Sequence, residues 1–355
     1  MANPHPTGLS ISLKLNGLKK DQLVKKFSRA KMDKFNIEKL NSVREELAGR
    51  IKKTPILALN GSKIAPLIPQ NTRMFIKLEL FQHTGSFKAR GALLGVDWLT
   101  PAQRKKGIAT FSGGNHALAI SWAAHQCGVS AKVIMPKFAD PIRIEGCKEN
   151  GAEVILAEDI ASAATLLNEI AETEDRTILH PFNDVNMAFG AASCGAEFME
   201  DLSEPDIVIL PVGGGGLIAG MAAAIKHYHP ETKVIGVEPK GANSLNRSFL
   251  SGKPEALDKV ETIADSLGAP SALSASFELA RANVDEIIEI EDQVMAEMML
   301  EMRDRLNLFV EPACAASLGA AVGPLRSEIV GKKIGVLACG SNISANRFAH
   351  YTQSL

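Results

Sequence analysis

The sequence predicts an α/β protein in which parallel β-sheets are flanked by helices. Segments with the pattern of strands alternate with segments with the pattern of helices along most of the chain, and this alternation is typical of strands joined by helical crossovers. The 355 residues suggest about two domains at roughly 150 residues each. The composition, 46% hydrophobic and 22% charged, is that of an ordinary globular protein. These observations exclude disordered and fibrous architectures.

The charge balance limits the class of partner. Lys and Arg number 39 against 40 Asp and Glu, a net charge of −1, so no overall basic field attracts nucleic acid or an anionic membrane. A small neutral or zwitterionic ligand suits this balance better. The five cysteines are scattered and form no CxxC pair, which predicts reduced thiols and no zinc site. We therefore expect no metal, no nucleic acid and no membrane partner.

The first 36 residues form a basic N-terminal extension. They carry eight Lys or Arg against two acidic residues and show no sustained apolar period. Such a segment is either a solvated tail or an organelle transit peptide, and the acidic Asp21 and Asp33 favour the tail. We predict a cytoplasmic protein and leave organelle targeting open.

Periodic segments follow in order from residue 37. Apolar residues recur at helical spacing over residues 37–51, directly after Asn36, a suitable N-cap. Apolar residues then alternate with others over residues 74–80, which is the period of a strand. Further strands are predicted at 108–111, 131–135, 153–156, 177–180, 207–212, 233–237, 284–290 and 333–338, and helices at 116–125, 160–172, 188–201, 217–228, 292–306 and 313–325.

Residues 207–225 contain no charge and are long enough to cross a bilayer. They also contain Pro211 and five glycines, and in a helix interior each glycine costs about 1 kcal/mol and proline about 3 kcal/mol relative to alanine. The segment is therefore predicted as a buried strand, a glycine loop and a helix.

The four consecutive glycines at 213–216 let backbone N–H groups converge on an anion in front of the helix dipole. We predict a phosphate-binding loop.

Two other strand-to-helix junctions carry residues suited to chemistry. The segment 112–116, Ser-Gly-Gly-Asn-His, allows the backbone to approach a second anion such as a carboxylate, although a simple turn explains it equally well. Lys88 lies at a predicted helix start, where the positive end of the dipole disfavours an ammonium and a lowered pKa makes the amine nucleophilic. A lone lysine is more often a solvated surface charge.

Together and in this order, the motifs resemble the serine/threonine dehydratase group of fold type II (tryptophan synthase beta-like) pyridoxal phosphate enzymes. The resemblance runs from about residue 37 to residue 347 and implies a two-domain α/β fold with pyridoxal 5'-phosphate as cofactor. It is carried by seven segments, at residues 85–92, 112–116, 180–182, 211–216, 262–265, 311–313 and 339–342.

The resemblance implies roles for individual residues. Lys88 would bind the aldehyde carbon of the cofactor as a Schiff base and, once displaced, remove the Cα proton of the substrate as the catalytic base. The other cofactor-binding residues would be Phe87, Asn115, Gly213, Gly214, Gly215, Gly216, Leu217 and Cys339. The substrate carboxylate would bind to Ser112, Gly113, Gly114, Asn115 and His116.

The implied reaction is the α,β-elimination, a dehydration and deamination, of a β-hydroxy amino acid such as L-threonine or L-serine to a 2-oxo acid and ammonia. Cys339 falls where the group places a small neutral residue beside the pyridine nitrogen. A neutral thiol cannot keep that nitrogen protonated as a carboxylate would, which favours elimination over transamination. A serine racemase or β-replacement enzyme of the same fold, or a catalytically silent binding homologue, remains as the alternative.

Two positions depart from related patterns. Gly113 stands where serine racemases carry a serine that serves as the second acid and base, so its lack of a side chain favours a lyase. Glu238 and Ala242 match a cation site of some relatives, but Ser244 stands where an aspartate would complete it. Because hard cations prefer carboxylate oxygens, we predict no metal there.

The same resemblance predicts how the chain divides. We expect a large cofactor-binding domain from residues 37–105 and 185–355 and a small mobile domain from residues 106–184, whose closure excludes water from the cleft. We also expect a homo-oligomer, a dimer or tetramer, that acts on a small amino-acid substrate. Met295, Met298, Met299 and Met302 are predicted to face the core or a subunit interface.

Overall fold

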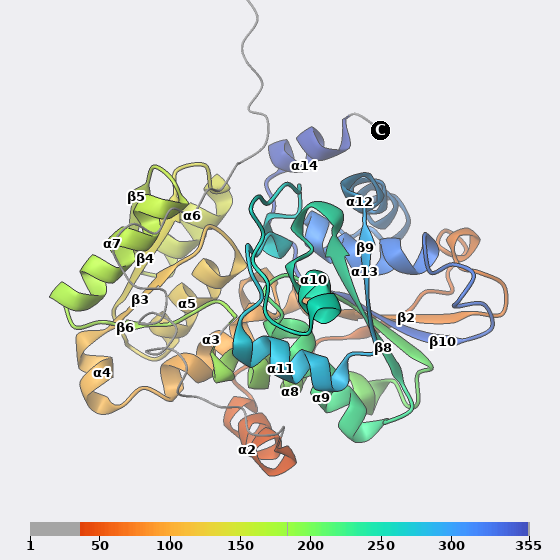
Figure 1. Ribbon diagram of the computed structural model, residues 1–355, viewed down its shortest axis with the longest axis horizontal. Helices are drawn as coiled ribbons and strands as arrows, with labels where there is room; N and C mark the ends of the chain where they lie inside the picture. The colour runs from red at the N-terminus through yellow and green to blue at the C-terminus, as the bar shows by residue number, and fades with distance from the viewer. Residues whose placement is uncertain (1–35, 183, 354–355) are drawn as a thin grey trace, which may run out of the picture.

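Two β-sheets organise the fold, as Figure 1 shows for the computed structural model, which describes residues 36–182 and 184–353. One sheet has six strands and the other has four. The predicted α/β class with sheets flanked by helices is confirmed. The basic extension predicted for residues 1–36 lies outside the described residues except for Asn36.

The four-stranded sheet has the order β5-β4-β3-β6 and all its pairs are parallel. With its helices it forms the left side of Figure 1. The predicted strand at 177–180 is shorter than expected, because the His180 N–H donates to the Asp184 carboxylate at 2.7 Å instead of to a strand. The elements of this part are α4 (Pro101–Lys106), β3 (Ile108–Phe111), α5 (Asn115–Gln126), β4 (Ala131–Pro136), α6 (Pro141–Glu149), β5 (Glu153–Ala157), α7 (Ile160–Thr173) and β6 (Thr177–Ile178).

The six-stranded sheet has the order β1-β2-β10-β7-β8-β9. Its pairs are parallel except that β1 runs antiparallel to β2 at the edge of the sheet, an exception that the strand-helix alternation did not predict. Its strands are β1 (Ile56–Ala58), β2 (Arg73–Leu78), β7 (Ile207–Pro211), β8 (Lys233–Pro239), β9 (Glu286–Ile290) and β10 (Lys333–Ala338).

Helices cover the six-stranded sheet on both faces. In Figure 1, α12 (Asp292–Leu306) and α13 (Pro312–Val322) lie above it, and α8 (Val185–Asp201), α9 (Gly216–Tyr228) and α11 (Ser274–Asn283) lie below it. The remaining helices are α2 (Ile37–Leu47), α3 (Lys88–Asp97), α10 (Ser244–Ser251) and α14 (Ala345–Thr352), with 3-10 turns η1 (Ala65–Leu67), η2 (Glu79–Phe81), η3 (His83–Gly85), η4 (Lys240–Ala242) and η5 (Asp265–Leu267).

Local sequence signals account for several of these elements. The Asn36 side chain accepts a hydrogen bond from the Lys39 N–H at 3.1 Å and caps α2. This helix ends at Leu47 rather than at residue 51, because Gly49 takes a left-handed φ of 72°. The methionine stripe of α12 is buried in the core of the six-stranded sheet and its helices, with exposures of 0–5%. Within residues 36–182 and 184–353, no helix combines the length and apolar character needed to cross a membrane.

The strand order brings three of the predicted motifs together. Strands β2, β10 and β7 are neighbours, and their carboxyl ends lead into Lys88, Cys339 and the glycine loop. Ligands of parallel sheets bind at such carboxyl ends, where the strand order reverses direction. The segment 112–116 follows β3 of the other sheet. The division into domains at residues 37–105 with 185–355 and at 106–184 stays a prediction.

Candidate active site

Lys88 opens α3 and has a half-buried side chain. Its Nζ donates a hydrogen bond to the Pro181 carbonyl at 2.6 Å and lies 5.1 Å from the centre of the Phe87 ring. No salt bridge to a carboxylate pairs it in the described part of the chain. Burial lowers the pKa of Lys88 to about 8, against a weaker opposing effect of Cys339. The amine is therefore far closer to its neutral, nucleophilic form than an ordinary lysine.

A strained turn leads from β2 to Lys88. Thr84 has a φ of 60° and Gly85 a φ of 70°, and a β-branched residue is seldom found in this region. The Asn342 side chain holds the turn, since its Nδ2 donates to the Thr84 carbonyl at 2.6 Å. A Cβ on Gly85 would lie 2.7 Å from the Asn342 Oδ1, so only glycine fits. Such strain gathers at functional sites, where surrounding contacts enforce it.

The four glycines form a turn between β7 and α9. Gly215 has a φ of 85° and is the N-cap of α9, whose first N–H groups have no partner within the helix. A Cβ on Gly214 would lie 2.3 Å from Cγ of the Phe182 ring. Leu217 is buried in the core directly behind the loop. Lys88 and the glycine loop thus contact neighbouring residues, Pro181 and Phe182, of one segment.

Replacing Gly214 with alanine is expected to weaken pyridoxal phosphate binding by about 1–3 kcal/mol, because the added Cβ must displace the Phe182 ring or the loop. The measurement is the cofactor dissociation constant of dialysed protein. Gly61→Ala is the matched control, since a Cβ there meets nothing within 4 Å. Equal affinity in the two variants would contradict this account of the loop.

Asn115 lies at the start of α5 and is 5% exposed. Its Nδ2 donates to Glu311 Oε1 at 2.6 Å and contacts Ser266 Oγ at 3.3 Å, while its Oδ1 accepts from Asn342 Nδ2 at 2.7 Å. These contacts fix which way the amide faces. The neighbouring Ser112 Oγ accepts from the Gly114 N–H at 3.2 Å and shapes the loop.

The buried side chain of His116 is a neutral imidazole. Its Nε2 lies 3.2 Å from the Leu179 carbonyl, which can only accept, so Nε2 carries the proton. Burial, followed by the charge of Lys88, holds the pKa of His116 well below its ordinary value. Its Nδ1 is buried without a protein partner among the described residues. A carboxylate at this loop would therefore bind to backbone N–H groups rather than to the neutral imidazole.

Cys339 follows β10 and is buried. Its carbonyl accepts from the Phe87 N–H at 3.1 Å, which ties the end of β10 to the residue before Lys88. Burial raises the pKa of the thiol well above its ordinary value, so the group is neutral. The other four cysteines are also free thiols.

Glu238 is buried and caps α10 from outside the helix. Its carboxylate accepts from the Leu245 N–H at 3.0 Å and from the Asn246 N–H at 2.7 Å. Burial raises its pKa to about 8, against the opposing effect of these two bonds. The Ser244 Oγ is buried and lacks a partner among the described residues. Within residues 36–182 and 184–353, no group of three or more His, Cys, Asp or Glu is arranged to hold a metal.

Three charged residues of the site received no role from sequence. Arg143 on α6 makes ion pairs with Asp265, at 2.6 Å, and with Glu311, at 3.1 Å. Burial raises the pKa of Glu311 to about 7, although the charge of Arg143 opposes the shift. Asp265 and Glu311 belong to motifs that carried the resemblance, but no sequence pattern marks Arg143.

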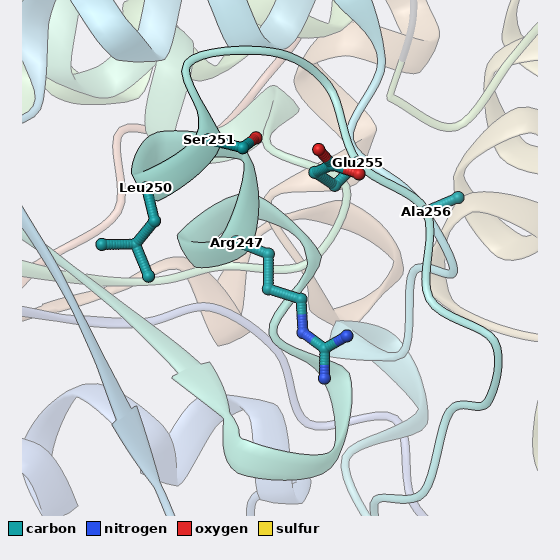
Figure 2. Close-up of a pocket in the computed structure, with 5 residues that line it drawn as sticks. All are labelled: Arg247, Leu250, Ser251, Glu255 and Ala256. Carbon is teal, nitrogen blue, oxygen red and sulfur yellow. The ribbon is translucent and has the colours of Figure 1, made fainter.

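The surface hollow in Figure 2 shares no residue with the site. It is lined by Arg247, Leu250, Ser251, Glu255 and Ala256.

The residues present fit pyridoxal phosphate. An amine of lowered pKa suits the aldehyde, and N–H groups at a glycine turn before α9 suit the phosphate. Asn115 suits the ring hydroxyl and the neutral Cys339 suits the pyridine nitrogen. These assignments are the roles predicted from the sequence, and the contact of each residue with the cofactor stays a prediction.

The rate at which apoprotein takes up pyridoxal phosphate is expected to rise with pH and then to level off, because only neutral Lys88 attacks the aldehyde. The midpoint of this rise should lie at the pKa of Lys88, about 8. Well below that midpoint the rate should fall about tenfold per pH unit. Stopped-flow absorbance of the bound cofactor measures it. A midpoint near 10.5, the ordinary lysine value, would show that the site does not lower the pKa.

Comparison with known proteins finds a matching family, similar sequences and similar structures. The sequence model of the family described as "Pyridoxal-phosphate dependent enzyme" matches residues 47–340. A phenylserine dehydratase of Ralstonia pickettii is 40% identical over 316 residues, covering 89% of this chain and 96% of that protein. A catabolic L-threonine dehydratase of Escherichia coli (strain K12) is 33% identical over 320 residues, covering 89% and 95%. The structure of maize serine racemase matches with a TM-score of 0.82 and 29% identity, covering 90% and 97%.

Proposed function

Because the chain belongs to the family of pyridoxal-phosphate dependent enzymes, with the fold type II architecture, we propose that it dehydrates and deaminates a β-hydroxy amino acid such as L-threonine or L-serine. The products are a 2-oxo acid and ammonia. The observation that carries the proposal is Lys88, an amine with a pKa of about 8 that contacts the segment packed on the glycine loop. Two dehydratases among the similar proteins support the substrate class.

Each group of the chain has a defined part in this proposal. When bound, pyridoxal phosphate withdraws electrons from the substrate Cα and so acidifies its proton. Lys88 Nζ accepts that proton as the Cα–H bond breaks, and it returns the proton to the hydroxyl oxygen as the Cβ–O bond breaks, so that water leaves. The dehydrated amino acid is released as an enamine, and water hydrolyses its imine form to the 2-oxo acid and ammonia. The N–H groups of residues 112–116 hold the substrate carboxylate at the start of α5. The neutral thiol of Cys339 would face the pyridine nitrogen and would not keep it protonated as a carboxylate does.

The surroundings of Gly113 support a lyase over a racemase. A racemase must return a proton to Cα from the face opposite Lys88, which needs a side chain with an acidic proton. Gly113 has no such side chain. A Cβ at this position would lie 3.1 Å from Cγ and Cδ of Pro136, so a larger residue would require Pro136 to move. This packing favours elimination as the outcome of Cα deprotonation.

The test is product analysis with purified protein and pyridoxal 5'-phosphate. L-threonine, L-serine and phenylserine are supplied separately, and ammonia and 2-oxo acid are measured together with the chirality of the remaining amino acid. Equal amounts of ammonia and oxo acid are expected. D-serine formed without oxo acid would instead establish a racemase, and a new amino acid formed from serine and an added thiol would establish β-replacement. Bound cofactor without turnover would establish a silent binding protein.

A further inference from the structure

Arg143 is a buried cation with all its hydrogen-bond capacity in use. It lies in the first turn of α6 and its side chain is 2% exposed. Its Nε donates to the Asn342 carbonyl at 2.8 Å, and its Nη1 donates to Asp265 Oδ2 at 2.6 Å and to the Gly113 carbonyl at 3.5 Å. Its Nη2 donates to Asp265 Oδ1 at 3.3 Å and to Glu311 Oε2 at 3.1 Å. A guanidinium has five N–H groups, so each one has an acceptor.

These acceptors come from both sheets. Gly113 belongs to the loop after β3 of the four-stranded sheet, on the same side as Arg143 itself. Asp265, Glu311 and Asn342 belong to segments that connect the strands and helices around the six-stranded sheet. Arg143 therefore fixes the loop 112–116 against the opposite half of the site.

Asn115 contacts two of the same residues. Glu311 uses its Oε2 for Arg143 and its Oε1 for Asn115 Nδ2, so one carboxylate holds both side chains. Asn342 uses its carbonyl for Arg143 and its side-chain Nδ2 for Asn115 Oδ1. The room for this arrangement depends on Gly340, since a Cβ there would lie 2.8 Å from Glu311 Oε1 and 3.2 Å from Asn115 Nδ2. Loss of Arg143 would leave the Glu311 carboxylate buried without its cation, and Asn115 would lose a fixed acceptor.

We propose that Arg143 is a positioning residue that sets the loop 112–116 and the Asn115 amide in the geometry that receives the carboxylate of the amino-acid substrate. This inference rests on the proposed function for the identity of the substrate. Lysine at this position retains a charge but offers three donors from one point, so it cannot reproduce the planar fork that reaches Gly113, Asp265 and Glu311 together.

The experiment compares holoenzymes of the wild type, Arg143→Lys and Arg143→Met. Glycine is the probe, since it has the amine and carboxylate of the substrate but no β-hydroxyl to eliminate, and its dissociation constant is measured from the absorption of the bound cofactor. We expect glycine to bind about tenfold more weakly to Arg143→Lys and weaker still to Arg143→Met, because charge-assisted hydrogen bonds are lost. The KM for L-threonine should rise in parallel, with cofactor retained.

Arg176→Lys is the matched control for loss of a partly buried arginine fork. Arg176 bonds to Glu174, Ser130 and Ile108, away from the site. If Arg143→Met does not fold, Arg143→Lys decides. Glycine affinity within twofold of wild type, or losses in the Arg143 variants no larger than in Arg176→Lys at equal thermal stability, would overturn the proposal. A wild-type enzyme that binds glycine but releases no ammonia from any hydroxy amino acid would refute the proposed function, and the glycine measurement would still test Arg143.

Discussion

Replacing Lys88 with alanine is expected to lower the kcat for oxo-acid and ammonia release by at least about 10³-fold, because the proposed base for the Cα proton is removed. The visible absorption of covalently bound cofactor should disappear as well. The glycine loop and the start of α9 are unchanged in this variant, so the phosphate should still bind without a covalent link. Absorption spectra and single-turnover assays measure the two effects separately.

The control for Lys88 is Lys240→Ala. Lys240 is an exposed lysine that pairs with Glu291 at 2.6 Å on the surface, and its loss should leave kcat within about twofold, because exposed ion pairs contribute little. Turnover by Lys88→Ala at more than about a tenth of the wild-type rate would contradict the role of Lys88 and with it the proposed chemistry.

A second large effect is expected at Arg90, two residues after Lys88 on α3. Arg90 is fully buried and donates from Nε and Nη2 to Glu79 at 2.8 Å on each oxygen. It also bonds to both oxygens of Glu197 on α8, at 2.8 Å each. Burial raises the pKa of Glu79, but the charge and hydrogen bonds of Arg90, together with the Thr54 hydroxyl and the charge of Lys77, outweigh burial and lower the pKa of that carboxyl. This cluster ties α3, and so Lys88, to η2, directly after β2, and to α8.

Replacing Arg90 with methionine is expected to lower the free energy of unfolding by about 3–5 kcal/mol, because the fully buried Glu79 loses the cation that bonds to both its oxygens, and Glu197 keeps only its ion pair with Lys77. Methionine occupies much of the same volume, so the loss reflects charge rather than a cavity. Urea unfolding at neutral pH, monitored by circular dichroism, measures the change. The difference in unfolding free energy between wild type and variant should shrink as the pH falls. Without Arg90, buried Glu79 takes up a proton at a higher pH than in the wild type, and a protonated carboxyl no longer needs the cation.

Arg44→Met provides the comparison for Arg90. Arg44 pairs with Glu200 at 2.5 Å in a partly exposed position on α2, where an ion pair contributes about 0–1 kcal/mol. A loss at Arg90 no larger than the loss at Arg44 would show that the buried cluster is not needed to hold α3.

The segments with a strong local period were predicted well. The helix at 292–306 and the strand at 108–111 have the predicted bounds, because each has a clear apolar pattern and a definite end. The antiparallel β1 was missed, since three residues carry too little pattern to separate a strand from a loop. The short α6 was also missed, because its apolar residues do not gather on one face.

The chain by itself determined the alternation of strands and helices, the glycine turn and the presence of a lysine at a helix start, since these depend on neighbouring residues and on backbone freedom. Only the tertiary structure decided that Lys88 and the glycine loop contact one segment, and that Arg143, Asn115 and Glu311 meet. Arg143 and Glu311 are separated by 168 residues, and no local preference of a polypeptide specifies a contact at that range. Burial between two sheets removes water from these charges and makes each the required partner of the other.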